Sequence, residues 1–80
     1  MLEITKTQMK YLRSISGYIA KNECPPTIVE LADEFGVACN SSRQHLIELE
    51  KKGMITRSNN ARSIRITDSG HALLKDRKNA

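Results

Sequence analysis

Apolar residues recur every three or four positions along the first quarter of the chain, which is the spacing of one face of a helix. This pattern predicts a first helix that begins at Thr5 or Thr7 and runs to about Asn22. Pro25 and Pro26 then stop the helix, because proline lacks a backbone N–H and restricts the residue before it. The stripe expected to face the core consists of Met9, Leu12, Ile15, Ile19 and Ala20.

A second, shorter helix is predicted to begin at Thr27. Glu30 stands three residues later, so the two residues form a capping box in which each side chain accepts from the other's backbone N–H. Gly36 ends this helix, because glycine adopts the positive φ that a helix C-terminus needs. Val37 is expected to plug the turn that follows. The buried stripe comprises Ile28, Leu31, Ala32 and Phe35.

A third helix is predicted to start at Asn40 or Ser41, both good capping residues, and to run to Lys52 before Gly53. Helical spacing separates two faces of this segment. The residues expected to face inward are Ser42, Leu46 and Leu49. The outward face then carries polar side chains, namely Ser41, Arg43, Gln44, His45 and Glu48.

Two strands and a last helix complete the pattern. Met54–Ser58 and Ser63–Thr67 alternate apolar and polar residues with a period of two, which predicts a β-hairpin. Asn59 and Asn60 suit its tip, because asparagine tolerates left-handed backbone angles. A short helix follows, capped by Asp68 or Ser69 and running through Leu73 and Leu74. The fold predicted for residues 1–80 is one mainly α domain with a small hairpin, a winged helix-turn-helix with the hairpin as its wing.

Positive charge is concentrated in the C-terminal part of the chain. Residues 1–50 carry five Lys and Arg against seven Asp and Glu, a net charge of −2, whereas residues 51–80 carry eight against two, a net charge of +6. The segment from Lys51 to Arg65 holds five cations and no acid. A focused basic stripe favours a surface that binds phosphate groups.

Length and composition disfavour several classes of function. A chain of 80 residues with 4% aromatic residues can build one aliphatic core but no enclosed cofactor pocket. No apolar run approaches the roughly 20 residues that span a bilayer, and the N-terminus lacks the apolar core of a signal peptide. We therefore expect a cytoplasmic protein that does not contact a membrane.

The residues able to ligate metal or perform catalysis are few and scattered. Cys24, Cys39, His45 and His71 do not fall into paired ligand spacing, so we expect reduced thiols and no metal, cofactor or small-molecule ligand. No nucleophile and base stand in a recognisable arrangement, and no phosphate-binding loop is present. An enzyme is therefore not expected.

The polar start of the third helix has the side chains that read DNA. Short residues let a helix approach the major groove, Arg can bond bidentately to guanine, and Asn or Gln to adenine. The candidate base-reading residues are Asn40, Ser41, Arg43 and Gln44. The candidate backbone contacts are Thr27, His45, Lys51, Lys52, Arg57, Asn59, Asn60, Arg62 and Arg65. Thr27 is equally well explained as a structural cap, and His45 is better explained as a surface or half-buried packing histidine.

These segments resemble the DNA-binding domain of LexA, the SOS repressor. Pro25–Val37 reads PPTIVELADEFGV, similar to the family's PPTxxEIAxxLG, and Asn40–Ile55 matches an Asn-bearing recognition helix followed by HLxxLxKKGMI. The likeness covers Thr5–Ile66. It implies a winged helix-turn-helix that binds operators as a dimer, and the family's base-reading positions match those assigned above.

The sequence also departs from that family. Two usually acidic positions are Arg43 and Gln44 here, so the expected operator differs from the SOS operator. The self-cleaving Ser/Lys protease domain is not in the sequence, and the tail ITDSGHALLK is similar to the wing-to-helix junction of MarR-type regulators. The resemblance therefore implies the fold and the DNA-binding surface, but not SOS induction or autoproteolysis.

We therefore predict a sequence-specific DNA-binding regulator, a prokaryotic or phage repressor, with double-stranded DNA as its partner. A weak homodimer is expected through Leu73 and Leu74, since one small domain can hardly bury both of them along with Leu2 and Ile4. The alternative is a protein-interaction module that uses the acidic face of Thr27–Phe35 and the C-terminal helix, because winged helices host both roles.

Overall fold

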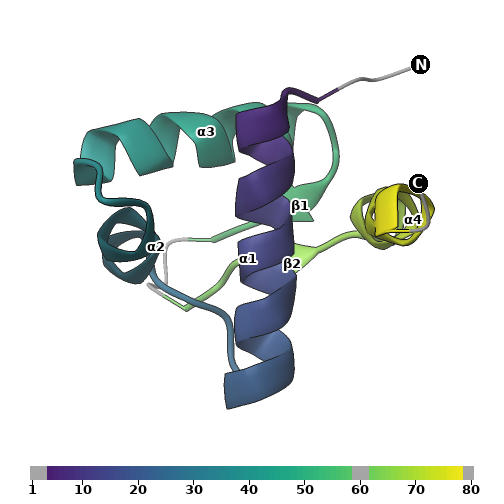
Figure 1. The fold of residues 1–80 in the computed structure, drawn as a ribbon, viewed down its shortest axis with the longest axis horizontal. Coiled ribbons are helices and arrows are strands. Elements are labelled where there is room, and N and C mark those ends of the chain that lie inside the picture. Colours follow the sequence, from purple (N-terminus) through teal and green to yellow (C-terminus); the bar gives the residue numbers. More distant parts are fainter. Residues whose placement is uncertain (1–3, 59–61, 79–80) are drawn as a thin grey trace.

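The computed structural model describes residues 4–58 and 62–78. Four helices and a two-stranded antiparallel hairpin follow one another in the predicted order, which confirms a mainly α winged helix-turn-helix (Figure 1). The elements are α1 (Lys6–Asn22), α2 (Ile28–Phe35), α3 (Cys39–Lys51), β1 (Ile55–Thr56), β2 (Arg65–Ile66) and α4 (Asp68–Lys78).

The core is aliphatic, with one tyrosine at its centre. It joins the predicted inward faces of α1, α2 and α3 to the base of the hairpin, through Tyr11, Leu12, Ile15, Leu31, Leu46, Leu49, Met54, Ile55 and Ile64. Tyr11 was not assigned to the core by the sequence pattern. Ala20, which was assigned to it, is exposed near the end of α1, so that assignment is wrong.

A capping box begins α1 and ties it to the end of α3. Thr5 N–H donates to Gln8 Oε1 at 3.1 Å, and Gln8 N–H donates to Thr5 Oγ1 at 3.0 Å. Lys52 Nζ also donates to Gln8 Oε1, at 2.8 Å. The buried Gln8 thus accepts a hydrogen bond from the backbone N–H that precedes α1 and another from Lys52, the C-cap residue of α3.

The predicted capping box of α2 is confirmed. Thr27 N–H donates to Glu30 Oε1 at 2.9 Å, and Glu30 N–H donates to Thr27 Oγ1 at 3.1 Å. Gly36 ends the helix with φ of 65°, as expected. Val37 was expected to fill the turn with its side chain, but that side chain is 42% exposed. Only its backbone takes part in the turn, where Val37 N–H donates to Ala32 O.

The predicted start of α3 is wrong by one to two residues. The helix begins at Cys39, and its N-cap residue is Ala38, whose side chain cannot accept a hydrogen bond from the helix. Ala38 O accepts from Ser41 N–H and Ser42 N–H, so the backbone already turns helically before Asn40. Asn40 and Ser41 therefore lie within the first turn of the helix.

The strands are shorter than the alternation predicted. Among the described residues, Ile55 pairs with Ile66 and Thr56 with Arg65, and the ladder has no further pair. Beyond them Ser63 Oγ accepts from Ser58 N–H at 2.9 Å and donates to Ser58 O at 3.1 Å. One hydroxyl thus occupies the backbone groups that a longer ladder would have paired.

The start of α4 packs tightly on the base of the hairpin. Thr67, rather than Asp68 or Ser69, caps the helix, since Gly70 N–H donates to Thr67 Oγ1 at 3.1 Å. The helix is also longer than predicted and reaches Lys78. Leu73 and Leu74 are both partly buried and both pack against the core, so neither side chain is left wholly available to a second protomer. Within the described residues no helix is long and apolar enough to cross a membrane.

Candidate nucleic-acid interface

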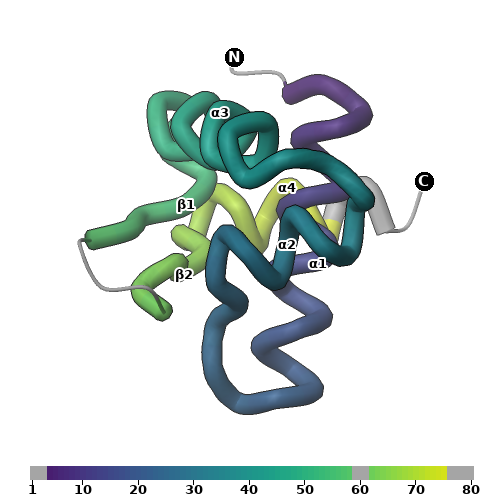
Figure 2. Tube along the Cα trace, turned by 90° about the vertical axis from the view of Figure 1, so that its left-hand side faces the viewer, coloured from purple at the N-terminus to yellow at the C-terminus, as the bar shows by residue number. Residues whose placement is uncertain are grey.

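The side chains predicted to read bases lie together on the first two turns of α3. Asn40, Ser41, Arg43 and Gln44 are all exposed. In Figure 2 the helix lies at the upper left, directly above the hairpin, and α1 lies on the opposite side. A polar helix end and a basic hairpin therefore share one side of the domain.

A buried hydrogen bond between α1 and α3 sets which face of α3 is exposed. Ser42 is fully buried, and its Oγ lies 2.8 Å from Tyr11 Oη. Leu46 and Leu49 follow on the same inward face and are also fully buried. Because neighbouring helix positions point about 100° apart, this anchoring turns Arg43 and Gln44 outward.

His45 packs on the core tyrosine. Its ring is half-buried and lies 5.0 Å from the Tyr11 ring, at an interplanar angle of 33°. Phe35 stacks on Tyr11 as well, with ring centroids 4.1 Å apart. The geometry supports the packing interpretation of His45, while its contact with a phosphate stays a prediction.

Thr27 serves as a structural cap in this structure. Its hydroxyl oxygen accepts from Glu30 N–H, and Thr27 is half-buried. The N-terminus of α2 is also the place where the wing is held, as described below. A phosphate contact by Thr27 stays a prediction.

The five cations between Lys51 and Arg65 divide into two groups. Lys52 bonds Gln8, and Arg57 Nε lies 3.2 Å from Glu50 Oε1. Arg62 is also paired. Lys51 and Arg65 are exposed and form no ion pair within the described part of the chain. Asn59 and Asn60, the predicted contacts at the hairpin tip, lie outside the described residues.

Arg62 lies against the start of α2. Its Nη1 donates to Glu30 Oε1 at 2.9 Å and its Nη2 to Glu30 Oε2 at 2.8 Å. Nη1 also lies 3.0 Å from Pro25 O and 3.4 Å from Tyr18 Oη. The Arg62 hydrogen bonds, with help from the Thr27 backbone, lower the pKa of Glu30 to about 2. The same pairing raises the pKa of Arg62 above its already high range.

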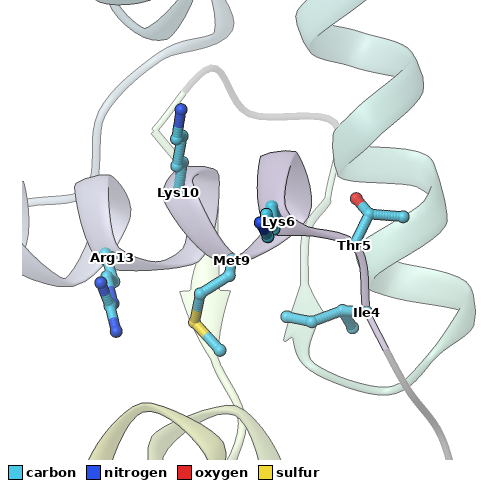
Figure 3. A pocket seen from close by; sticks show the side chains of 6 residues that line it. All are labelled: Ile4, Thr5, Lys6, Met9, Lys10 and Arg13. Atoms are coloured by element: carbon cyan, nitrogen blue, oxygen red, sulfur yellow. The ribbon is translucent and has the colours of Figure 1, made fainter. Parts of the chain in front are cut away.

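A second group of basic residues lies along α1, where the net charge of −2 over residues 1–50 conceals it. That helix carries Lys6, Lys10, Arg13 and Lys21 and no acid. Figure 3 shows a pocket of about 280 Å³ at its N-terminal half, with Met9 and Arg13 pointing toward α4 and Lys10 pointing the other way. Arg13 also lines a neighbouring groove with Leu74 of α4. The net charge of each predicted helix, taken separately from the rest of residues 1–50, would have revealed these basic residues.

No group of three or more potential metal ligands comes together among the described residues. Cys24 is half-buried and Cys39 is exposed, and neither forms a disulfide.

Comparisons with known proteins agree with the geometry. The family model described as "LexA DNA binding domain" matches residues 1–63. The LexA repressor of Thermotoga maritima is 41% identical over 70 residues, which cover 86% of this chain and 36% of that protein. The LexA repressor of Leptospira interrogans is 37% identical over 67 residues, 82% of this chain and 33% of that protein. The chain thus spans about a third of the length of these relatives. It belongs to the LexA DNA-binding domain family, which confirms the resemblance seen in its sequence.

Proposed function

We propose that this protein is a sequence-specific DNA-binding transcriptional regulator that acts as a repressor. The observation that carries the proposal is the exposed cluster of Asn40, Ser41, Arg43 and Gln44 on the first two turns of α3. The N-terminal half of α3 would enter the major groove, where Arg43 can bond guanine and Gln44 adenine. The relatives named LexA repressor support the direction of regulation.

The predicted backbone contacts differ in what they need in order to reach a phosphate. Lys51 and Arg65 are exposed and can do so without rearrangement. Arg57 would first have to leave Glu50, and Lys52 would have to leave Gln8. We therefore propose Lys51, at the end of α3, and Arg65, on the wing, as the main phosphate contacts among the described residues.

We further propose that residues 1–80 act as one non-catalytic domain on DNA in the cytoplasm. The alternative role as a protein-interaction module is not favoured, because the family model that matches the chain is a DNA-binding domain. α2 does have an acidic face, on which Asp33 and Glu34 are exposed. The same domain also presents the polar N-terminal end of α3, which is the feature expected of a DNA-binding domain.

Selection from random duplex DNA at a fixed salt concentration tests the proposal. We expect one enriched motif that contains a guanine read by Arg43. An Arg43→Ala protein should then lose the preference at that position and keep most of its non-specific affinity, since base contacts specify and phosphate contacts position. Enrichment of no motif by the folded wild-type protein would refute sequence-specific binding.

A homodimer on DNA is also proposed, because a single recognition helix reads only a short half-site. Since Leu73 and Leu74 both pack on the core, the contact would use only their remaining exposed edges. Sedimentation of the protein with and without a selected duplex tests this point. A single protomer per duplex at saturating protein would exclude the dimer.

A further inference from the structure

We infer that Arg62 is a positioning residue that locks the wing onto the N-terminus of α2 through Glu30, rather than a ligand of DNA phosphate. This inference rests on the proposed DNA-binding function. It assigns to Arg62 and Glu30 a shared task, which is to hold the hairpin at the angle at which Arg65 meets the DNA backbone.

The hydrogen bonds of Arg62 converge on one place. Both Nη atoms face the Glu30 carboxylate, and Nη1 also approaches Pro25 O and Tyr18 Oη. A two-pronged guanidinium–carboxylate pair fixes orientation as well as distance. The returning limb of the wing is thereby joined to the end of α1, to the connection after it and to the start of α2.

The carboxylate that receives Arg62 is itself held in place. Glu30 Oε1 accepts from Thr27 N–H at 2.9 Å in the capping box of α2. Glu30 therefore cannot move without breaking the helix cap. Arg62 is bound to a fixed point on the helix-turn-helix rather than to a freely rotating surface acid.

The wing needs such an attachment because its own pairing is short. Two residue pairs form the ladder in the described part of the wing, and Ser63 is hydrogen-bonded to Ser58 beyond them. A two-stranded hairpin alone is marginal in water. The Glu30–Arg62 contact, between residues 32 apart in sequence, fixes the hairpin relative to α2 and so relative to α3.

The pair contributes to orientation more than to global stability. The side chains of Arg62 and Glu30 are 45% and 35% exposed, and exposed ion pairs add little to the free energy of unfolding. Loss of the pair should therefore leave the domain folded with a less well-oriented wing. Its effect should appear in DNA affinity.

Glu30→Gln is the sharpest test, because glutamine can keep the capping box while the charged partner of Arg62 is lost. Neutralising an acid near DNA would by simple electrostatics strengthen binding. The lock predicts the opposite, a loss of affinity for the selected duplex of roughly fivefold. Asp33→Asn is the matched control on the same helix, since it removes an exposed acid that forms no ion pair with the described part of the wing.

A double-mutant cycle then separates the two roles of Arg62. If Arg62 acts through Glu30, Arg62→Ala in the Glu30→Gln background should cost little more, and the slope of log K against log salt should stay unchanged. If Arg62 binds phosphate, Arg62→Ala should cost the same in both backgrounds and reduce the slope by about 0.9. Circular dichroism of each variant checks that it is folded.

The outcomes distinguish this inference from the proposed function. Failure of the wild-type protein to select any motif would remove the function itself. Wild-type binding combined with equal or tighter binding by Glu30→Gln would overturn the lock alone, as would additive effects with a reduced salt slope.

Discussion

Tyr11 and Ser42 join α1 to α3 through a single buried hydrogen bond of 2.8 Å between residues 31 apart in sequence. In sequence, Ser42 lies between the exposed residues Asn40 and Ser41 on one side and Arg43 and Gln44 on the other. The hydrogen bond of the buried Ser42 therefore fixes the orientation of these exposed side chains. Tyr11 also stacks on Phe35 of α2. One core side chain thus contacts both helices of the helix-turn-helix.

Replacing Tyr11 by Phe should destabilise the domain by about 1–3 kcal/mol, because the buried Ser42 hydroxyl would lose its partner. Urea unfolding of the variant measures this cost. The double variant Tyr11→Phe, Ser42→Ala should recover part of the loss, since neither hydroxyl then needs a partner. Equal stability of Tyr11→Phe and wild type would show that the hydrogen bond contributes nothing.

Base recognition should depend on Arg43 and Gln44 separately. Each bidentate contact is worth about 1–3 kcal/mol of discrimination against the wrong base. Arg43→Ala and Gln44→Ala should therefore relax different positions of the selected motif, which sequencing of the enriched pools would show. An unaltered motif in both variants would mean that α3 does not read the bases.

Salt dependence should separate the two basic surfaces. Lys51→Ala combined with Arg65→Ala should reduce the slope of log K against log salt by roughly two, because each lost phosphate contact removes about 0.9. Arg13→Ala is the matched control, since Arg13 lies on α1 and lines a groove with Leu74 of α4. A slope that falls equally for Arg13→Ala would place α1 in the interface as well.

The pairing of Glu30 with Arg62 should make stability depend on pH in the acid range. The pKa of Glu30 is lowered from 4.5 to about 2 on folding. A lowered pKa contributes stability that is present above pH 4.5 and is lost as the pH falls toward 2. Urea unfolding across this range should show the difference between wild type and Glu30→Gln shrinking as acid is added. A constant difference would contradict the pKa shift.

The sequence predicted the parts of the fold that depend on local chemistry. Thr27 with Glu30, and Gly36 after Phe35, specify a helix start and end through contacts within a few residues. The inward face of α3 was predicted for the same reason, since helical spacing alone places Ser42 beside Leu46 and Leu49.

The partners of the charged side chains could not be predicted, because they depend on distant segments. Arg62 and Glu30 are 32 residues apart, and Lys52 and Gln8 are 44 apart. A basic run in sequence shows where cations are, but not which of them the fold neutralises. The prediction of the strand lengths failed for a related reason, because the Ser63 hydroxyl is hydrogen-bonded to the backbone N–H and C=O of Ser58, which a longer ladder would have used.

Two glycines in helices should respond oppositely to a methyl group. A Cβ at Gly70 would overlap the carbonyl oxygen of Met54 and the side chain of Ile66, where α4 crosses the base of the hairpin. A Cβ at Gly17, in the middle of α1, would meet no atom within 4 Å among the described residues. The first glycine is required by packing, and the second is not.

Gly70→Ala should therefore destabilise the domain by about 1–3 kcal/mol, the usual cost of forcing extra volume into a packed site. Gly17→Ala should stabilise it by roughly 0.5–1 kcal/mol, because alanine loses less conformational freedom in a helix. Thermal unfolding of both variants beside wild type measures the two signs together. Because Gly70 lets α4 approach Met54 and Ile66 at the base of the hairpin, an undiminished stability of Gly70→Ala would show that α4 can shift away from the hairpin without cost.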